Sequence, residues 1–428
     1  MATPIWVTVG RGSSPGSSIL WSTDGRNWND ASSGGFTNGS GYYAGSRVAY
    51  GNGTWISAGA GYKPTSSILW STDGRKWYDA SSGGFTGGGG YYGNSVAYGS
   101  GTWVAVGTGS TPKSTIKWST DGRTWHDASS GGFYAYTVYK TFIIGRGVYY
   151  DGIGKWVAVG YGNTPTSTIK WSTDGRTWND ASSGGFSALY GGTSVAYGNG
   201  VWVAVGYGSS PTSSIQWSTD GRTWNDALSG GFYNVIRGHI GSGIAYGNST
   251  WVAVGQGYSP TSSILWSTDG RNWYNAYSGG FDIFAPYGIN NGLDVYYNGS
   301  AWVAVGNGNT LQSTILWSPD GKTWQDASSG GFSGYVAPAL PTTTTTTGPP
   351  TTTTTTVPPV PKIPVNVRFP NRYTGGYDSS TVTDKLRWAT IANFKQMQFN
   401  KPNRNTDMGG AVAIAKKAAV GCLKNSPS

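Results

Sequence analysis

The sequence contains no glutamate, and all 19 of its acidic residues are aspartate. It has one cysteine, Cys422, and two histidines, His126 and His239. A single cysteine excludes an intrachain disulfide, and a histidine with no cysteine or second histidine nearby does not form a metal site. We therefore expect neither a disulfide framework nor a bound metal or cofactor.

Long apolar runs are absent as well. No segment is apolar over the length that a membrane-spanning helix requires, so we expect no transmembrane segment. The residues before Trp6 contain neither a basic start nor an apolar run, which predicts that there is no classical signal peptide. What the chain does have in abundance is glycine, with 70 residues, and tryptophan, with 22.

Twenty-one of the 22 tryptophans belong to one pattern that is copied seven times. Each copy has a first tryptophan in a Trp-Val-Ala-Val-Gly-like run, and a second and third in Trp-Ser-Thr-Asp-Gly-Arg-x-Trp. The second tryptophans are Trp21, Trp70, Trp118, Trp171, Trp217, Trp266 and Trp317, spaced by 46 to 53 residues. This period exceeds that of two-helix repeats and suits four short strands with their turns, which is the size of a propeller blade.

One copy shows where the strands are expected. Short runs at Val195–Tyr197, Trp202–Val205, Ser214–Ser218 and Thr223–Ala227 are separated by turn residues, and Asp220-Gly221 is typical of a tight hairpin. The sequence therefore predicts an all-β fold, a seven-bladed β-propeller of four-stranded antiparallel blades, over residues 1–337.

The two ends of this array are expected to meet. The chain begins at a second strand, Ile5–Val9, so the first blade lacks its inner strand. The segment Tyr335–Ala337, after the last copy, resembles the missing strand. We expect it to complete the first blade and to close the ring, which removes an open sheet edge.

The segment Ser22–Trp28 and its six siblings resemble Asp-boxes, the turns found in sialidases, sortilin-type receptors and photosystem-assembly propellers. The spacing from Asp24 to Trp28 is one residue shorter than in the familiar box, which makes the hairpin tighter. The longer unit also resembles repeats of phage tail proteins and of proteins from large DNA viruses, over residues 5–337.

In the Asp-box family the aspartate is structural, and turn chemistry agrees, because a short carboxylate accepts hydrogen bonds from the backbone N–H groups that follow it. Seven equivalent copies also argue against one catalytic centre. We predict structural roles for Asp24, Asp73, Asp121, Asp174, Asp220, Asp269 and Asp320.

An enzyme of sialidase-like architecture is the alternative. The resemblance implies an arginine cluster, a tyrosine nucleophile with a glutamate partner, and an acid/base aspartate, but the chain has no glutamate. Other glycosidases use two aspartates, and Asp282 and Asp294 lie in one predicted loop. Turn-capping roles are the ordinary explanation for such aspartates. We predict no catalytic residue and a non-enzymatic protein.

Recognition is expected on the face that carries the connections from the fourth strand of one blade to the first strand of the next. These connections differ strongly between copies and contain aromatic residues, which present rigid amphipathic surfaces suited to sugars and proteins. Packing between blades is the other role open to these rings. The candidate ligand-binding residues are Tyr92, Tyr139, Arg237, His239 and Tyr287.

The composition changes after the array. Residues 338–364 are rich in proline and threonine and predict an extended stalk, and residues 365–428 predict a small, partly helical basic domain. Residues 338–428 hold 11 Lys/Arg against 3 Asp, whereas residues 1–337 hold 18 against 16. Because these charges are dispersed, they favour docking to a protein assembly over nucleic-acid binding. The predicted anchoring residues are Arg387, Trp388, Phe394, Lys395, Lys416 and Lys417.

Two classes of function follow. The first is a non-enzymatic display protein, with a propeller head that binds host glycan or protein and a C-terminal anchor in a larger assembly. The viral resemblance makes this a minor capsid or surface protein of a large DNA virus, located at the virion surface. The alternative is an extracellular lectin or a glycoside hydrolase.

Overall fold

The computed structural model describes residues 6–12, 14–23, 29–37, 43–86, 91–136, 141–142, 144–187, 191–210, 212–233, 239–257, 259–281, 290–297, 299–307, 313 and 315–326. The predicted stalk, C-terminal domain and anchoring residues lie outside these ranges, as does Tyr335–Ala337. Within them every regular element is a β-strand or a short 3-10 helix, which confirms the all-β prediction. No helix in the described ranges is long and apolar enough to cross a membrane.

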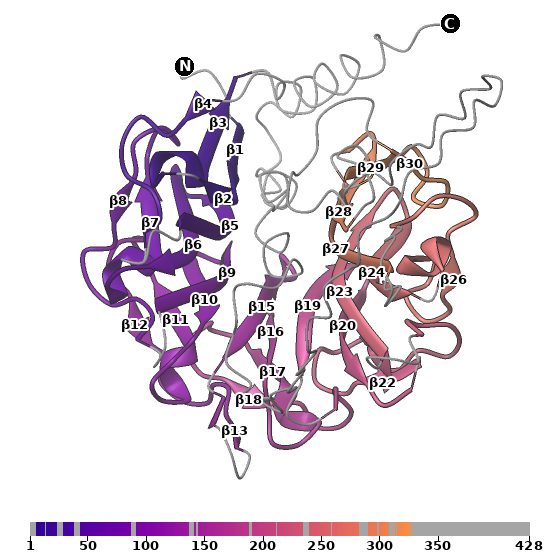
Figure 1. Ribbon diagram of the computed structural model, residues 1–428. Helices are drawn as coiled ribbons and strands as arrows, with labels where there is room; N and C mark the ends of the chain where they lie inside the picture. The colour runs from indigo at the N-terminus through magenta and orange to yellow at the C-terminus, as the bar shows by residue number, and fades with distance from the viewer. Residues whose placement is uncertain are drawn as a thin grey trace, which may run out of the picture.

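The strands form successive antiparallel units in chain order (Figure 1). The first unit is β1 (Trp6–Val9), β3 (Ile19–Ser22) and β4 (Asn29–Asp30). The second is β5 (Tyr43–Gly51), β6 (Thr54–Gly61), β7 (Ile68–Ser71) and β8 (Tyr78–Asp79). The third is β9 (Tyr91–Gly99), β10 (Thr102–Gly107), β11 (Ile116–Ser119) and β12 (His126–Asp127). The fourth is β15 (Gly145–Tyr150), β16 (Trp156–Gly160), β17 (Ile169–Ser172) and β18 (Asn179–Asp180).

Three further units follow the same plan. The fifth is β19 (Gly192–Gly198), β20 (Val201–Gly208), β21 (Ile215–Ser218) and β22 (Asn225–Asp226). The sixth is β23 (His239–Gly247), β24 (Thr250–Gly257), β25 (Ile264–Ser267) and β26 (Tyr274–Asn275). The seventh is β27 (Asn290–Tyr297), β28 (Trp302–Gly306), β29 (Ile315–Ser318) and β30 (Gln325–Asp326). Two short strands, β13 (Ala135–Tyr136) and β14 (Thr141–Phe142), form a hairpin between the third and fourth units.

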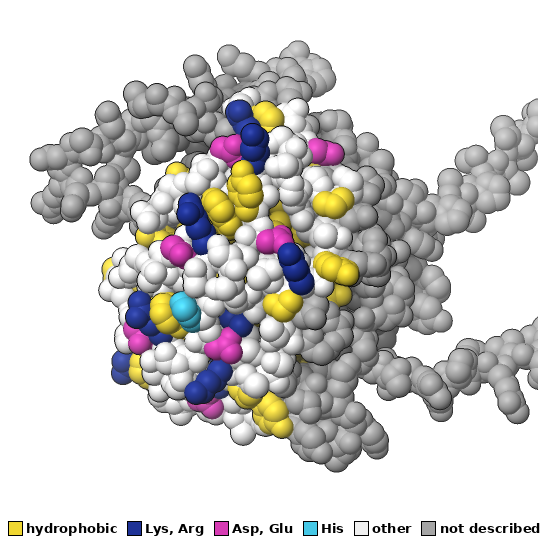
Figure 2. All heavy atoms as spheres, turned by 90° about the vertical axis from the view of Figure 1, so that its left-hand side faces the viewer, with side chains coloured by type: hydrophobic (Ala, Val, Ile, Leu, Met, Phe, Trp, Pro, Cys, Tyr) yellow, Lys and Arg dark blue, Asp and Glu magenta, His cyan; other side chains and the backbone are white. Residues whose placement is uncertain are grey.

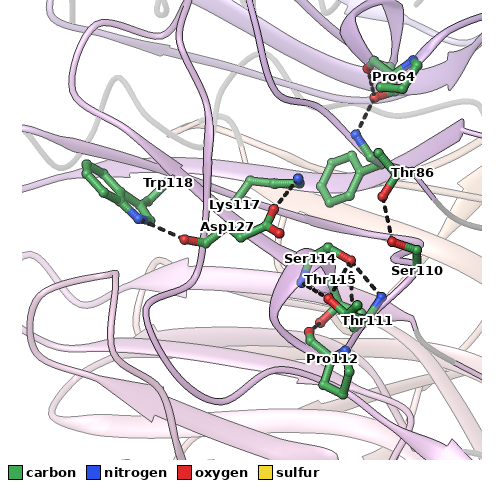
Figure 3. Close-up of polar contacts among 12 residues, drawn as sticks. Pro64, Thr86, Ser110, Thr111, Pro112, Ser114, Thr115, Lys117, Trp118 and Asp127 are labelled. Atoms are coloured by element: carbon green, nitrogen blue, oxygen red, sulfur yellow. Dashed lines mark hydrogen bonds and ion pairs between the residues drawn. The ribbon is translucent and has the colours of Figure 1, made fainter.

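The structure corrects two details of the predicted unit. The fourth strand has two residues, Asn225–Asp226 in the fifth unit, because the Asp-Gly turn occupies the positions before it. The Pro/Thr/Ser segment before each third strand is a 3-10 helix rather than a plain turn, and a buried hydroxyl at its end accepts a backbone N–H (Figure 3 shows η3 of this set). These helices are η1 (Gly16–Ser18), η2 (Pro64–Ser67), η3 (Lys113–Thr115), η4 (Thr166–Thr168), η5 (Thr212–Ser214) and η6 (Pro260–Ser263).

The hydrophobic core lies between neighbouring units. In each cluster the second strand of one unit packs against the first tryptophan of the next, for example Val203 and Val205 against Trp251. The first tryptophan is fully buried in the third to seventh units, with exposures of 0–1%. A unit of this kind buries both faces only against its neighbours, which is why the apolar pattern must recur in phase.

Two kinds of backbone contact join neighbouring units in the described ranges, the first at every interface except that between the fourth and fifth units and the second at all six. At one end, the last residues of the second strand pair with the start of the following first strand, as in Ala60↔Tyr92 and Tyr207↔Ile240. At the outer side, the segment after the fourth strand forms parallel bridges to the Asp-Gly turn of the next unit, from Ser33↔Lys76 to Ser278↔Thr323. Six such outer bridges occur in the described ranges.

The Asp-Gly turns make the hydrogen bonds that turn chemistry predicts at six positions, while Asp24 lies outside the described residues. The carboxylate oxygen Oδ1 accepts the backbone N–H groups two and three residues later at 2.7–2.8 Å. Burial alone would raise the pKa of the Asp269 carboxyl. Hydrogen bonds from the Asn272 and Arg271 backbone and from the Asn272 and Ser267 side chains outweigh it and lower the pKa to about 2.

We predict that Asp269→Ala lowers the free energy of unfolding at neutral pH by about 1 kcal/mol, the scale of a lost turn or capping hydrogen bond. A carboxyl whose folded pKa is depressed stabilises above its unfolded value and loses that contribution as pH falls through the folded value. The difference from wild type should therefore persist down to about pH 4 and shrink towards about pH 2.

The matched control is Asp269→Asn, which keeps an acceptor oxygen and removes the charge. It should retain most of the stability and lose the pH dependence, as measured by denaturant unfolding at several pH values. A difference between Asp269→Ala and wild type that is the same at pH 7 and pH 2 would contradict this role for the carboxylate.

Candidate functional site

The candidate site lies at the end of the units where second strands finish and first strands begin. The first strands lie on the inner side of the array, and the short fourth strands lie on its outer side (Figure 1). Because strands alternate in direction, the 3-10 segments and the connections between units open at this end. The Asp-Gly turns and the hairpins between first and second strands lie at the other end.

One position at this end differs between units, although its neighbours barely change. It follows the Trp-Val-Ala-Val-Gly run and precedes a second glycine in every unit. Its occupants in chain order are Arg11, Ala60, Thr108, Tyr161, Tyr207, Gln256 and Asn307. Because the glycines on either side are constant, the pairing of the strands there does not require one particular side chain at this position.

The fourth and fifth units place a cation among aromatic rings here. Arg146, the second residue of β15, is buried, and its Nη2 donates a hydrogen bond to the Tyr161 hydroxyl at 2.6 Å. Its guanidinium carbon lies 4.4 Å from the centroid of the Tyr161 ring and 5.5 Å from that of the Tyr207 ring. Cation–π contacts hold the guanidinium in place, so this side of the end is positively charged.

The sixth and seventh units present acceptors instead. Asn307 is only 7% exposed, and its Oδ1 has no hydrogen-bond partner in the described chain. The Oε1 atom of Gln256, at the same position of the preceding unit, is likewise buried without a partner. A buried carbonyl oxygen without a donor is costly, and Gln256 and Asn307 place two such oxygens at equivalent positions of consecutive units.

Two further non-repeat charges lie on the inner strands. The Arg47 guanidinium of β5 and the Asp294 carboxylate of β27 form an ion pair of 2.8 Å. Tyr149 of β15 and Tyr296 of β27 stand where other units have alanine. Burial raises the pKa of both phenols, and the proximity of Tyr149 raises that of Tyr296 further. Both hydroxyls therefore stay protonated, which does not suit them to act as nucleophiles.

The structure describes two of the five predicted binding residues. Tyr92 lies in strand β9 rather than in a loop, and its backbone pairs with Ala60 and Thr108, so it helps to join the second and third units. His239 is the first residue of β23 and not part of an irregular loop. Its Nδ1 lies 3.1 Å from the Phe232 carbonyl oxygen, and its ring stacks on Tyr233 at 5.6 Å.

The remaining predicted residues, Tyr139, Arg237 and Tyr287, lie outside the described residues. Tyr92 and His239 belong to the third and sixth units, so the two described candidates do not share one unit. Sequence analysis missed Arg47, Arg146, Gln256 and Asn307. The signal that identifies them is variation between the seven copies at an aligned position whose neighbours are constant.

The hypothetical pair of aspartates in one loop is wrong for Asp294. This residue lies within strand β27 and pairs with Arg47, because the alternating pattern around it continues a strand. Asp282 lies outside the described residues. Within the described part of the chain, no group of three or more His, Cys, Asp or Glu side chains is placed to hold a metal ion.

Comparison with protein-family models and with curated proteins gives no match. Among solved structures, the computationally designed Ika8 protein is similar with a TM-score of 0.39 and 11% identity, over 65% of this chain and 71% of that one. The extracellular domain of the putative one component system BT4673 from B. thetaiotaomicron is similar with a TM-score of 0.42 and 8% identity, over 74% of this chain and 42% of that one. These similarities say nothing about activity or ligand.

We predict that Asn307→Leu raises the free energy of unfolding by about 1 kcal/mol, because it removes a buried oxygen that has no donor. The matched control is Asn94→Leu. The Asn94 Nδ2 donates to the Gly145 carbonyl oxygen at 2.8 Å and so links two units, and its loss should destabilise by about 1 kcal/mol. Denaturant unfolding of both variants measures whether each substitution raises or lowers the free energy of unfolding. A clear loss of stability in Asn307→Leu would show that the side chain is a structural group.

Proposed function

We propose that the seven units form one closed seven-bladed β-propeller. Six equivalent interfaces support this proposal, since each adds the same step around a common centre (Figure 1). The Arg47–Asp294 ion pair supports it further, because it joins the inner strands of the second and seventh units, far apart in sequence. The first unit would lie between them, and its missing inner strand would be supplied by residues near 335–337.

One further contact of the repeat bears on closure, namely the cation–π pair between neighbouring units. In each described interface, the Arg or Lys after the Asp-Gly turn lies over the second tryptophan of the preceding unit, at 4.1–4.3 Å from the ring centroid. Trp317 in the last unit has no following unit in an open array. In a closed ring its partner would be Arg26 of the first Asp-Gly turn.

A double-mutant cycle tests closure. Arg26→Ala and Trp317→Leu should couple by about 0.5–1 kcal/mol, the usual scale of an exposed cation–π contact. The internal pair Arg222→Ala and Trp171→Leu is the matched control and should couple equally. Zero coupling between Arg26 and Trp317, beside normal coupling in the control pair, would mean that the array is open.

We further propose that this ring is a non-enzymatic recognition head that binds its ligand at the variable end. The observation that carries the proposal is that different units place different chemical groups at this end. The fourth and fifth units place the Arg146 guanidinium between the rings of Tyr161 and Tyr207, whereas the sixth and seventh place the carbonyl oxygens of Gln256 and Asn307 without a donor in the described chain. A ligand with both acceptors and donors, such as a host glycan or a protein surface, suits such a division.

The described carboxylates do not favour catalysis. Those of the Asp-Gly turns accept backbone hydrogen bonds, which lower the pKa of a carboxyl such as that of Asp174 and do not suit it to act as a general acid. The Asp294 carboxylate forms an ion pair with Arg47. We propose that the Pro/Thr-rich stalk and residues 365–428 fix this head to a larger assembly such as a virion. Charge and composition of that region support this proposal.

The test uses the full-length protein on a printed glycan array and with a panel of fluorogenic glycosides. We expect array binding without hydrolysis, and we expect Gln256→Leu/Asn307→Leu to lose binding by tenfold or more while remaining at least as stable as wild type. Undiminished binding by this stable double variant would place the site elsewhere. Hydrolysis of a fluorogenic glycoside by the purified protein would contradict the non-enzymatic role.

A further inference from the structure

The outer rim of the array carries an indole platform in every unit. The second tryptophan of each unit donates its Nε1–H to the backbone carbonyl opposite, at 3.1–3.2 Å in the first six units. One face of the same ring is covered by the Arg or Lys of the next unit. Figure 2, which views part of this rim, shows basic side chains interspersed with hydrophobic ones. The rings are therefore fixed in orientation before any ligand arrives.

The residue opposite the indole divides the first six units into two classes. In the second, third and sixth units it is aromatic and packs on the indole, with ring centroids 4.6–5.0 Å apart. These residues are Tyr78, His126 and Tyr274. A cation and a ring this close to one indole must occupy its two faces. In the first, fourth and fifth units the equivalent residue is an exposed asparagine, namely Asn29, Asn179 or Asn225.

The aromatic units show what fits in the space that the asparagine units leave. The ring of Tyr78 lies 28° from the plane of Trp70, so a flat six-membered ring packs there without any change in the scaffold. In the sixth unit Tyr277 adds an edge contact, and Trp266 becomes only 9% exposed. In the fourth unit an exposed serine, Ser182, takes the place of Tyr277. The indole face of Trp171 therefore has a polar rim and no aromatic cover.

We propose that Trp21, Trp171 and Trp217 are binding sites for a pyranose ring of a glycan. The apolar C–H face of the sugar would stack on the indole where Tyr78 stacks in the second unit, and its hydroxyls would bond to the asparagine amide, which both donates and accepts. This inference adds a ligand class and a second binding surface to the proposed recognition function. It rests on that function for the role of glycan binding, and on the rim geometry for the site itself.

The chemistry favours a neutral sugar over other occupants. The Arg222 guanidinium lies 4.1 Å from the Trp171 centroid. A ligand cation on the opposite face of the indole would therefore be repelled by this positive charge. At Trp171 an aromatic peptide side chain would find a single apolar surface bordered by amide and hydroxyl groups, whereas a sugar uses both kinds of group. At Trp217 the position of the serine holds Leu228, which is 64% exposed, so the Asn225 amide supplies the polar border there. Three similar sites on one ring would raise the avidity for a branched or densely displayed glycan.

The test is a titration of the full-length protein labelled with 5-fluorotryptophan, followed by 19F NMR. The probes are the methyl glycosides of glucose, galactose, mannose, fucose and N-acetylglucosamine. We expect at least one of them to shift the Trp171 and Trp217 signals with a dissociation constant on the order of 1 mM, and to leave Trp70 and Trp266 unmoved. Single-site variants assign the signals.

Substitutions that exchange asparagine and tyrosine between equivalent positions test the site directly. Both residues already occur at this position in the chain, so the scaffold accommodates either one. Asn179→Tyr should abolish the Trp171 response with unchanged stability, as tyrosine occupies this position in the second and sixth units. The reverse change, Tyr78→Asn, should create a response at Trp70. The Gln256→Leu/Asn307→Leu variant should leave these rim responses intact, which separates this site from the variable end.

Absence of any shift at Trp171 and Trp217 up to about 50 mM of every glycoside, far above a weak single-site constant, would overturn the proposal. A response that survives Asn179→Tyr would also overturn it, since the ring would then bind elsewhere. Shifts produced by a tyrosine-containing peptide and by none of the glycosides would assign the platform to protein ligands instead.

Discussion

One residue per unit, the Arg or Lys after each Asp-Gly turn, holds every unit to the one before it. Its carbonyl oxygen accepts a backbone N–H of the preceding unit at 2.8–2.9 Å, and its side chain covers that unit's second tryptophan. The aspartate carboxylate fixes the backbone N–H of this same residue. Hairpin shape, interface geometry and the placing of the indole therefore depend on one turn, and its aspartate and glycine recur in all seven copies.

The fold was largely predictable for this reason. A turn such as Ser172–Trp178 has a local signature, and seven in-phase signatures with Trp and Val between them specify antiparallel units that stack. The details that sequence missed are those that tertiary contacts decide. The hydroxyl at the end of η4 is buried by the next segment, and the fourth strand shrinks to Asn179–Asp180 beside the turn.

The candidate site was less predictable, because sequence analysis looked for aromatic residues in variable loops. Tyr92 and His239 instead belong to strands and hold the scaffold. The charged and amide residues of the candidate site lie within or directly after strands. At these positions the units carry different residue types. Arg146 and Asn307 carry no local motif, so only comparison of the units in register could expose them. His126 is exposed, and its ring packs on Trp118.

This division explains how one scaffold could combine stability with recognition. Buried positions repeat, and they keep the units interchangeable. Two surfaces depart from the repeat, one at the end of the inner strands and one on the rim, where asparagine replaces an aromatic ring. At the rim, the residue that varies lies beside an indole that the Arg or Lys of the next Asp-Gly turn also contacts, and the variable end lies at the other end of the strands from these turns. Side chains on both surfaces can therefore change while the turn sequence stays the same.

The central claim is that identical interfaces join the units into one cooperative ring. Native-state amide hydrogen exchange, followed unit by unit, tests it most directly. A closed ring predicts that the interface amides of Ser32 and Tyr277, near the two ends of the array, are as strongly protected as that of Ser182 in the middle. Protection that declines steadily from the fourth unit towards both ends is the behaviour of an open stack, and it would contradict the account.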